Sequence, residues 1–143
     1  MSKNIRASNN PVPGLATIDV RNLRLRTFIG FNPEEKEKQQ DVVINMEIRY
    51  VLPDGALEDR VTDALDYKVI TKKVIRHVEE GRFLLLERLV GDVLGICSEH
   101  PAVSFARVTI DKPNALRFAD SVSLTLEYRQ SEAQPLRLVE TAS

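Results

Sequence analysis

The feature that most constrains the fold is a regular alternation of apolar and polar residues between residues 42 and 50. Apolar side chains occupy the even positions and polar ones the odd positions from 45 onward: Val42, Ile44, Met46, Ile48 and Tyr50 against Asn45, Glu47 and Arg49. Side chains two residues apart point to the same face of a β-strand, so this segment predicts a strand with one buried face. It is the clearest strand in the sequence.

Three further segments predict strands, and two predict helices. The strands are expected at residues 16–28, 103–112 and 121–129, and the helices at residues 67–80 and 83–99. The first strand changes parity at Arg21–Asn22, which indicates a bulge inside one long strand. Asp66 is expected to cap the first helix and Gly81 to end it, whereas Pro101 follows the second helix.

The order of these elements is β-β-α-α-β-β, which predicts an α+β domain with a four-stranded antiparallel sheet and two helices on one face. Such a small sheet leaves two open edges, so we expect it to pair with other subunits in a ring-like homo-oligomer. The chain has 143 residues, enough for one domain, which we expect at residues 16–129. A mobile N-terminal arm is expected at residues 1–15 and a C-terminal tail at residues 130–143.

Composition argues against several classes of protein. The 20 Lys and Arg residues against 21 Asp and Glu residues leave no basic excess for binding nucleic acid. Apolar runs of about three to four residues are too short to span a membrane, and residues 1–10 lack the apolar segment of a secretory signal. The single cysteine, Cys97, and the two separated histidines, His77 and His100, argue against a protein-held metal. We therefore expect a cytoplasmic protein without a metal or other cofactor.

Four residues break the pattern of the element on which they lie. Lys112 continues the buried parity of its strand, Glu87 lies at the margin of the second helix's apolar stripe, and Tyr67 begins the first helix. Glu35 lies in the charged loop between the first two strands. Each residue alone also fits a structural interpretation: a charged group reaching water at the core boundary, a core tyrosine, or a solvated loop residue. The pattern alone is therefore only a weak indication of an active site.

These residues occur within four longer segments: NLRLRTFIGFNPEE (22–35), ALDYKVITKKVIRHVE (64–79), RFLLLERLVGDVL (82–94) and VTIDKPNALRFADSVSLTLE (108–127). Together these segments resemble the dihydroneopterin aldolase family of tunnelling-fold (T-fold) enzymes, over about residues 16–129. Within the family, NLRLRTFIG, QDVVIN and ALRFADSVSLTL are most similar to the dihydroneopterin triphosphate 2′-epimerase branch. The Lys112-Pro113 pair is also similar to the aldolase branch.

The resemblance implies oligomeric barrels, with an octamer of two tetrameric rings and active sites at subunit interfaces. It implies a reduced pterin substrate and conversion of 7,8-dihydroneopterin triphosphate to 7,8-dihydromonapterin triphosphate by retro-aldol and aldol steps at C2′. One alternative is the aldolase of folate biosynthesis, which releases 6-hydroxymethyl-dihydropterin and glycolaldehyde. Another is a pterin-binding oligomer without catalytic activity.

The resemblance also implies roles for individual residues. Lys112, Tyr67 and Glu35 would be catalytic, with Tyr67 contributed by the neighbouring subunit. Glu87 would bind the pterin through its carboxylate, and Leu86 through its backbone. Six cations are candidates for contacting the triphosphate: Arg24, Arg26, Lys36, Lys38, Lys72 and Arg117. Each of them fits a solvated surface equally well. Arg117, which follows the strand that carries Lys112, is the first to test.

Overall fold

The computed structural model of the chain describes residues 14–131. The expected arm at residues 1–15 and tail at residues 130–143 lie outside this range except at their inner ends. The first strand begins at Leu15, one residue inside the expected arm. No helix in the described part of the chain is long and apolar enough to cross a membrane.

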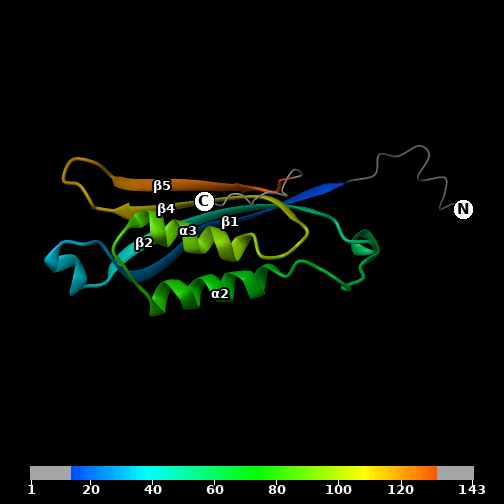
Figure 1. Cartoon of the computed structure of the whole chain (residues 1–143), viewed down its shortest axis with the longest axis horizontal. Coiled ribbons are helices and arrows are strands. Elements are labelled where there is room, and N and C mark those ends of the chain that lie inside the picture. Colours follow the sequence, from blue (N-terminus) through cyan, green and yellow to red (C-terminus); the bar gives the residue numbers. More distant parts are fainter. Residues whose placement is uncertain (1–13, 132–143) are drawn as a thin grey trace, which may run out of the picture.

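Nine elements follow one another along the chain (Figure 1). They are β1 (Leu15–Ile29), η1 (Pro33–Lys36), β2 (Gln40–Val51), η2 (Ala56–Glu58), α2 (Tyr67–Glu80), β3 (Arg82–Phe83), α3 (Leu86–Cys97), β4 (Val103–Pro113) and β5 (Ser121–Arg129). The expected α+β class and the order of the four long strands and two helices are confirmed. The second helix begins three residues later than expected, because Arg82–Phe83 are extended and pair with β1.

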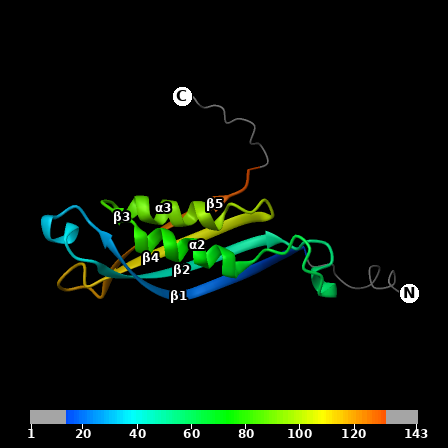
Figure 2. The same ribbon diagram turned by 90° about the horizontal axis from the view of Figure 1, so that it is seen from below.

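The strands form one sheet in the order β3-β1-β2-β4-β5. The four long strands pair antiparallel, as expected, and the short β3 adds a fifth strand that runs parallel to the end of β1. Both helices lie on one face of the sheet (Figures 1 and 2). The outer edge of β1 pairs only at Phe28–Ile29, and β5 is the other edge strand of the described sheet.

The predicted bulge in β1 is confirmed, with the pairing to β2 shifting between Val20 and Leu23. Asn22 takes a left-handed backbone conformation with φ of 56°. Its N–H donates to Oδ1 of Asn45 at 2.9 Å, so a side chain of β2 replaces the missing ladder bond. The bulge keeps apolar residues on the helix side both before and after the shift.

The hydrophobic core lies between the sheet and the two helices. Its fully buried members include Val74 and Val78 of α2, Leu89, Val90 and Val93 of α3, Ile44 and Ile48 of β2, and Val108 and Ile110 of β4. The buried Thr27 hydroxyl donates to the carbonyl of Val78 at 2.6 Å and so ties the end of β1 to the end of α2. Asp66 caps α2 as predicted, accepting from the N–H groups of Lys68 and Val69.

The two ends of the sheet carry different segments (Figure 1). At one end lie η1, the end of β4, the β4–β5 turn and the start of α3. At the other end lie η2, the start of β1 and the start of α2. Because α2 has 14 residues and an α-helix rises 1.5 Å per residue, its two ends are about 20 Å apart. Residues at the start of α2 are therefore remote from η1 within one chain.

Candidate active site

An ion pair between Glu35 and Lys112 forms the centre of the candidate site. Nζ of Lys112 donates to Oε2 of Glu35 at 3.1 Å. The lysine side chain is only 13% exposed and the glutamate side chain 23%. Lys112 reaches this position because it keeps the helix-side parity of Val108 and Ile110 up to the last residues of β4. The structure thus brings together two of the residues that the sequence predicted for the site.

The Glu35 carboxylate is held by several groups at once. Oε1 accepts from the backbone N–H of Asn32 at 3.3 Å, and Oε2 also accepts from Nε2 of Gln40 at 3.4 Å. Partial burial is the largest single influence on the pKa of this carboxyl group and acts to raise it. The hydrogen bonds and the charge of Lys112 together outweigh burial, so the pKa of Glu35 lies below its ordinary value. Glu35 is therefore a fixed anion beside Lys112 at neutral pH.

Gly30 makes room for this carboxylate. Its φ of 132° lies in a region that L side chains rarely adopt. A Cβ built on Gly30 would meet Oε1 of Glu35 at 2.1 Å. The backbone N–H of Gly30 donates to the carbonyl of Phe83 at 2.9 Å, which fixes the turn against β3. The glycine therefore allows Glu35 to lie against the main chain and face Lys112.

Leu86 and Glu87 form the first turn of α3, at the same end of the sheet as η1 and the end of β4 (Figure 1). Leu86 is partly buried against the core, whereas Glu87 is exposed. Within residues 14–131 the Glu87 carboxylate has no hydrogen bond or ion pair. The N-cap residue is Leu85, whose side chain cannot accept a hydrogen bond from the first N–H groups of the helix. Among the described residues, this turn therefore presents a carboxylate beside backbone donors that have no acceptor.

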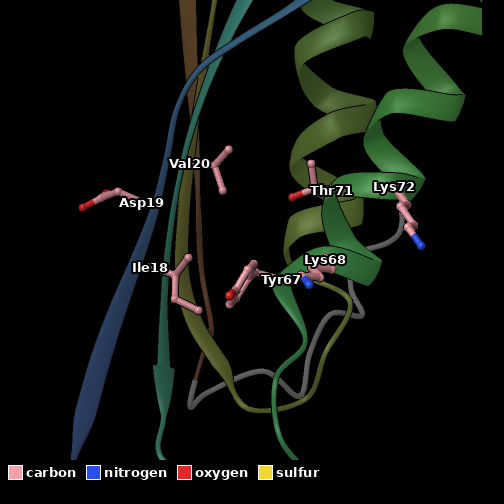
Figure 3. Close-up of a pocket in the computed structure, with 7 residues that line it drawn as sticks. All are labelled: Ile18, Asp19, Val20, Tyr67, Lys68, Thr71 and Lys72. Atoms are coloured by element: carbon pink, nitrogen blue, oxygen red, sulfur yellow. The ribbon is translucent and has the colours of Figure 1, made fainter.

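Tyr67 lies at the opposite end, as the first residue of α2, and is 52% exposed. It lines a pocket of about 620 Å³ between β1 and the start of α2. Figure 3 shows Ile18 and Val20 pointing from β1 toward Tyr67 and Thr71 on the helix. Because the length of α2 separates it from Lys112, Tyr67 cannot join Glu35 and Lys112 within one chain. One chain therefore carries two separate sets of candidate residues.

Three of the six cations proposed for the triphosphate, Lys36, Arg117 and Arg24, lie in different places. Lys36 is in η1 beside Glu35, and Arg117 is in the β4–β5 turn, where its guanidinium carbon lies 5.3 Å from the Phe118 ring centroid. Arg24 follows the opposite parity from the buried Leu25, so it lies on the sheet face away from the helices. The structure therefore does not gather these three cations into one group.

Several residues of both sets were not predicted from the sequence. Gln40 and Gly30 support Glu35, yet glutamine in a charged run gives no signal, and a turn glycine does not reveal which side chain lies against it. Ile18, Val20 and Thr71 line the Tyr67 pocket. Their spacing along the strand and the helix is that of inner-face residues, but such spacing does not show that the space between the two elements is open.

The side chains of His77 and Cys97 contact groups other than Glu35 and Lys112. Nε2 of His77 lies 2.7 Å from Oδ2 of Asp92, which also pairs with Arg88. Cys97 is fully buried, with its Sγ 3.4 Å from Sδ of Met46, and burial raises the pKa of its thiol to about 12. In the part of the chain that the structure describes, no group of three or more His, Cys, Asp or Glu side chains could hold a metal ion.

The fold, a mainly antiparallel sheet covered on one face by two helices, is that of a T-fold enzyme. The family model described as "Dihydroneopterin aldolase" matches residues 18–127, and the chain belongs to this family. The chain is 54% identical to dihydroneopterin triphosphate 2′-epimerase of Pseudomonas aeruginosa, over 80% of this chain and 93% of the relative. It is 30% identical to dihydroneopterin aldolase of Escherichia coli, over 76% of this chain and 88% of the relative.

A solved structure supports the same assignment. The chain matches the crystal structure of Escherichia coli dihydroneopterin aldolase in complex with neopterin with a TM-score of 0.72. The match has 28% sequence identity and covers 79% of this chain and 98% of that chain. The T-fold expected from the sequence is therefore confirmed, and the epimerase branch is a closer relative than this aldolase.

Proposed function

We propose that the protein is a dihydroneopterin triphosphate 2′-epimerase that converts 7,8-dihydroneopterin triphosphate to 7,8-dihydromonapterin triphosphate. The observation that carries this proposal is the identity of 54% to an epimerase against 30% to an aldolase of the same family. The Glu35–Lys112 pair supports it, because the reaction needs a group that moves protons beside the substrate.

The proposed chemistry begins with removal of the proton from the 2′-hydroxyl group. The C1′–C2′ bond then breaks, C2′ becomes an aldehyde, and the electron pair moves through C1′ to N5 of the C6=N5 imine, which takes up a proton. The aldehyde fragment turns and presents its other face. The enamine carbon C1′ attacks that face, the new C2′ alkoxide is protonated and N5 loses its proton, so C2′ is inverted. Because the substrate itself accepts the electron pair, the protein's task is to bind, orient and move protons.

The residues at the η1 end are suited to the pterin ring and to N5. The carboxylate of Glu87 would accept hydrogen bonds from the 2-amino group and N3, as a charge-assisted pair. The first N–H groups of α3, including that of Leu86, would donate to the ring carbonyl. The ammonium of Lys112 would deliver and recover the proton at N5, and the anion of Glu35 would keep that ammonium oriented.

Tyr67 would come from a second copy of the chain and exchange a proton with the side-chain hydroxyl groups. Two observations support a shared site. Tyr67 is separated from Lys112 by about the length of α2. The sheet also offers edges for pairing, since β5 and most of β1 are unpaired on their outer sides within the described chain. The corresponding assembly is a ring of four copies, with two rings forming an octamer.

The test is to incubate the purified protein with 7,8-dihydroneopterin triphosphate and, separately, with unphosphorylated 7,8-dihydroneopterin. The products are dephosphorylated, the side-chain stereoisomers are resolved by chromatography, and free glycolaldehyde is assayed. Inversion at C2′ of the triphosphate with little released fragment is expected. Glu87→Ala should mainly raise KM and Lys112→Ala should mainly lower kcat, whereas Glu79→Ala, which removes an exposed carboxylate of α2, should change neither. Equal, small effects of Glu87→Ala and Lys112→Ala would contradict these roles.

The aldolase reaction is the second candidate, because the chain is 30% identical to an aldolase over most of its length. It would use the same cleavage step, followed by release of glycolaldehyde and protonation of C1′. Release of glycolaldehyde from the unphosphorylated compound without inversion of the triphosphate would identify the aldolase. Binding of both compounds without turnover would identify a pterin-binding oligomer that lacks catalytic activity.

A further inference from the structure

Two lysines on α2 lack partners, although most cations near them are paired. Lys73 pairs with Glu99 at 3.1 Å, and Arg76 lies 3.7 Å from Glu80. The ammonium groups of Lys68 and Lys72 have no hydrogen bond or ion pair among residues 14–131. They are four residues apart and therefore lie on neighbouring turns of the same helix face.

Both lysines border the pocket that contains Tyr67 (Figure 3). The pocket is floored by Ile18 and Val20, and Figure 3 shows the Thr71 side chain on the side of the helix that faces β1, whereas the Lys72 side chain points away from β1. Asp19 also borders the pocket, but its side chain points away from it in Figure 3, and its carboxylate lies 3.3 Å from Arg21. The positive charge at the rim is therefore not neutralised by a carboxylate of the pocket.

We infer that Lys68 and Lys72, with the Thr71 hydroxyl, bind the triphosphate tail of the substrate. This inference rests on the proposed function. A substrate anchored by Glu87, with N5 at Lys112, extends its C2′ and C3′ atoms away from that copy and toward the Tyr67 of the next one. The phosphates are attached beyond C3′. They therefore reach the helix that begins at Tyr67.

The geometry of α2 suits this assignment. Five helical residues rise about 7.5 Å, so the Lys72 position lies about 1.4 turns beyond Tyr67. Both lysine side chains are exposed and free to change rotamer toward a bound anion. Ammonium groups donate strong, charge-assisted hydrogen bonds to phosphate oxygens, and the threonine hydroxyl adds a further donor.

Two of the other cations proposed for the tail fit it less well. Lys36 lies in η1, where Glu34 and Glu35 surround it with negative charge that would repel a polyphosphate. Arg24 lies on the sheet face away from the helices. Arg117 lies in the β4–β5 turn, at the same end of the sheet as Lys112, and is therefore the rival cation that the test must separate from the two lysines.

Lys68 and Lys72 would also decide whether the cleaved aldehyde fragment stays bound or is released. After C1′–C2′ cleavage the aldehyde must turn without leaving, and a tail held by two ammonium groups prevents its escape. Loss of these contacts should increase release of the phosphorylated glycolaldehyde relative to epimerisation. Lys68 and Lys72 would thus separate an epimerase outcome from an aldolase outcome after a shared cleavage step.

The test compares kcat/KM for 7,8-dihydroneopterin triphosphate with that for 7,8-dihydroneopterin. In the Lys68→Gln/Lys72→Gln double variant, this ratio is expected to fall on the order of 100-fold, about tenfold for each charged hydrogen bond lost. The double variant should also release more aldehyde fragment for each inversion at C2′. Lys73→Gln removes a charge from the same helix, and Arg117→Gln removes the rival cation. Neither should change the ratio. Circular dichroism and thermal midpoints verify that each variant is folded.

An unchanged ratio in the double variant, or a larger loss in Arg117→Gln, would overturn the inference while leaving the epimerase function intact. Equal losses on both substrates would overturn it too, since the lysines would then not act on the tail. Wild-type protein that is inactive on both compounds would contradict the proposed function itself, and the inference with it.

Discussion

Replacement of Gly30 by alanine tests the construction of the site most sharply. The new Cβ would lie 2.1 Å from Oε1 and 2.2 Å from Cδ of Glu35, so the carboxyl group must move. The backbone must also hold alanine at a φ of 132° or change its path. If Glu35 moves, Lys112 loses its partner while its side chain is only 13% exposed.

The magnitude follows from these two effects. A side chain forced into a sparsely populated backbone region costs about 1–3 kcal/mol. Loss of a hydrogen bond between charged groups costs about 1.5–3 kcal/mol. Because relaxation of the chain can relieve part of each cost, the two costs do not add in full. We expect Gly30→Ala to lower the free energy of unfolding by roughly 2–5 kcal/mol. We also expect kcat to fall at least about tenfold, because the ammonium of Lys112 is no longer oriented.

Gly95→Ala is the matched control. Gly95 lies within α3, and a Cβ built there would have nothing within 4 Å. Alanine at a helix interior is more favourable than glycine by about 0.5–1 kcal/mol, so this variant should be slightly more stable. Both variants are unfolded in urea at the same protein concentration, and their kcat values are measured on the triphosphate.

A double-mutant cycle identifies the cause. In a Glu35→Ala background the carboxylate is absent, so Gly30→Ala should cost only the backbone contribution. The reasoning is refuted if Gly30→Ala costs as much in that background as in the wild type. It is also refuted if Gly30→Ala is as well tolerated as Gly95→Ala.

Three further predictions concern pH, the buried thiol and the helix cap. The pKa of Glu35 is lowered in the folded protein, so its ionised form adds stability above the ordinary glutamate pKa. That stability is lost as pH falls through the lowered pKa. In urea unfolding, the free energy of unfolding of the wild type should therefore exceed that of Glu35→Gln at neutral pH, and this difference should shrink only on acidification. The Cys97 thiol, whose pKa burial raises to about 12, should resist iodoacetamide at neutral pH and react at once in denaturant; rapid native labelling would contradict its burial. Asp66→Ala should cost about 1 kcal/mol of unfolding free energy, because the N–H groups of Lys68 and Val69 lose their acceptor, and Asp66→Asn should restore most of it.

Much of the fold follows from local patterns in the sequence. The helix at Tyr67–Glu80 was predicted to the residue, because a capping aspartate, an apolar stripe and a terminal glycine all agree. The bulge at Arg21–Asn22 was visible as a change of parity. The short β3 was not predicted, since two residues carry no periodicity and their pairing depends on where β1 ends.

The site was less accessible to sequence reasoning. Lys112 was recognised from its buried parity, but its distance from Glu35 depends on a turn whose shape Gly30 determines. Glu87, predicted at the margin of the apolar stripe of its helix, is exposed in the single chain. Under the proposed function, the group that pairs with its carboxylate belongs to the substrate. The remoteness of Tyr67 from Lys112 depends on how α2 lies along the sheet, which no local pattern specifies.

The most direct test of the shared site is to mix two inactive variants, Tyr67→Phe and Lys112→Ala, after dissociating and reassociating their oligomers. If each site takes Tyr67 from one copy and Lys112 from its neighbour, random mixing at equal amounts restores about one quarter of the sites to wild-type composition. We predict recovery of about that share of epimerase activity. A mixture that reassembles but stays as inactive as either variant alone would contradict a site built from two copies.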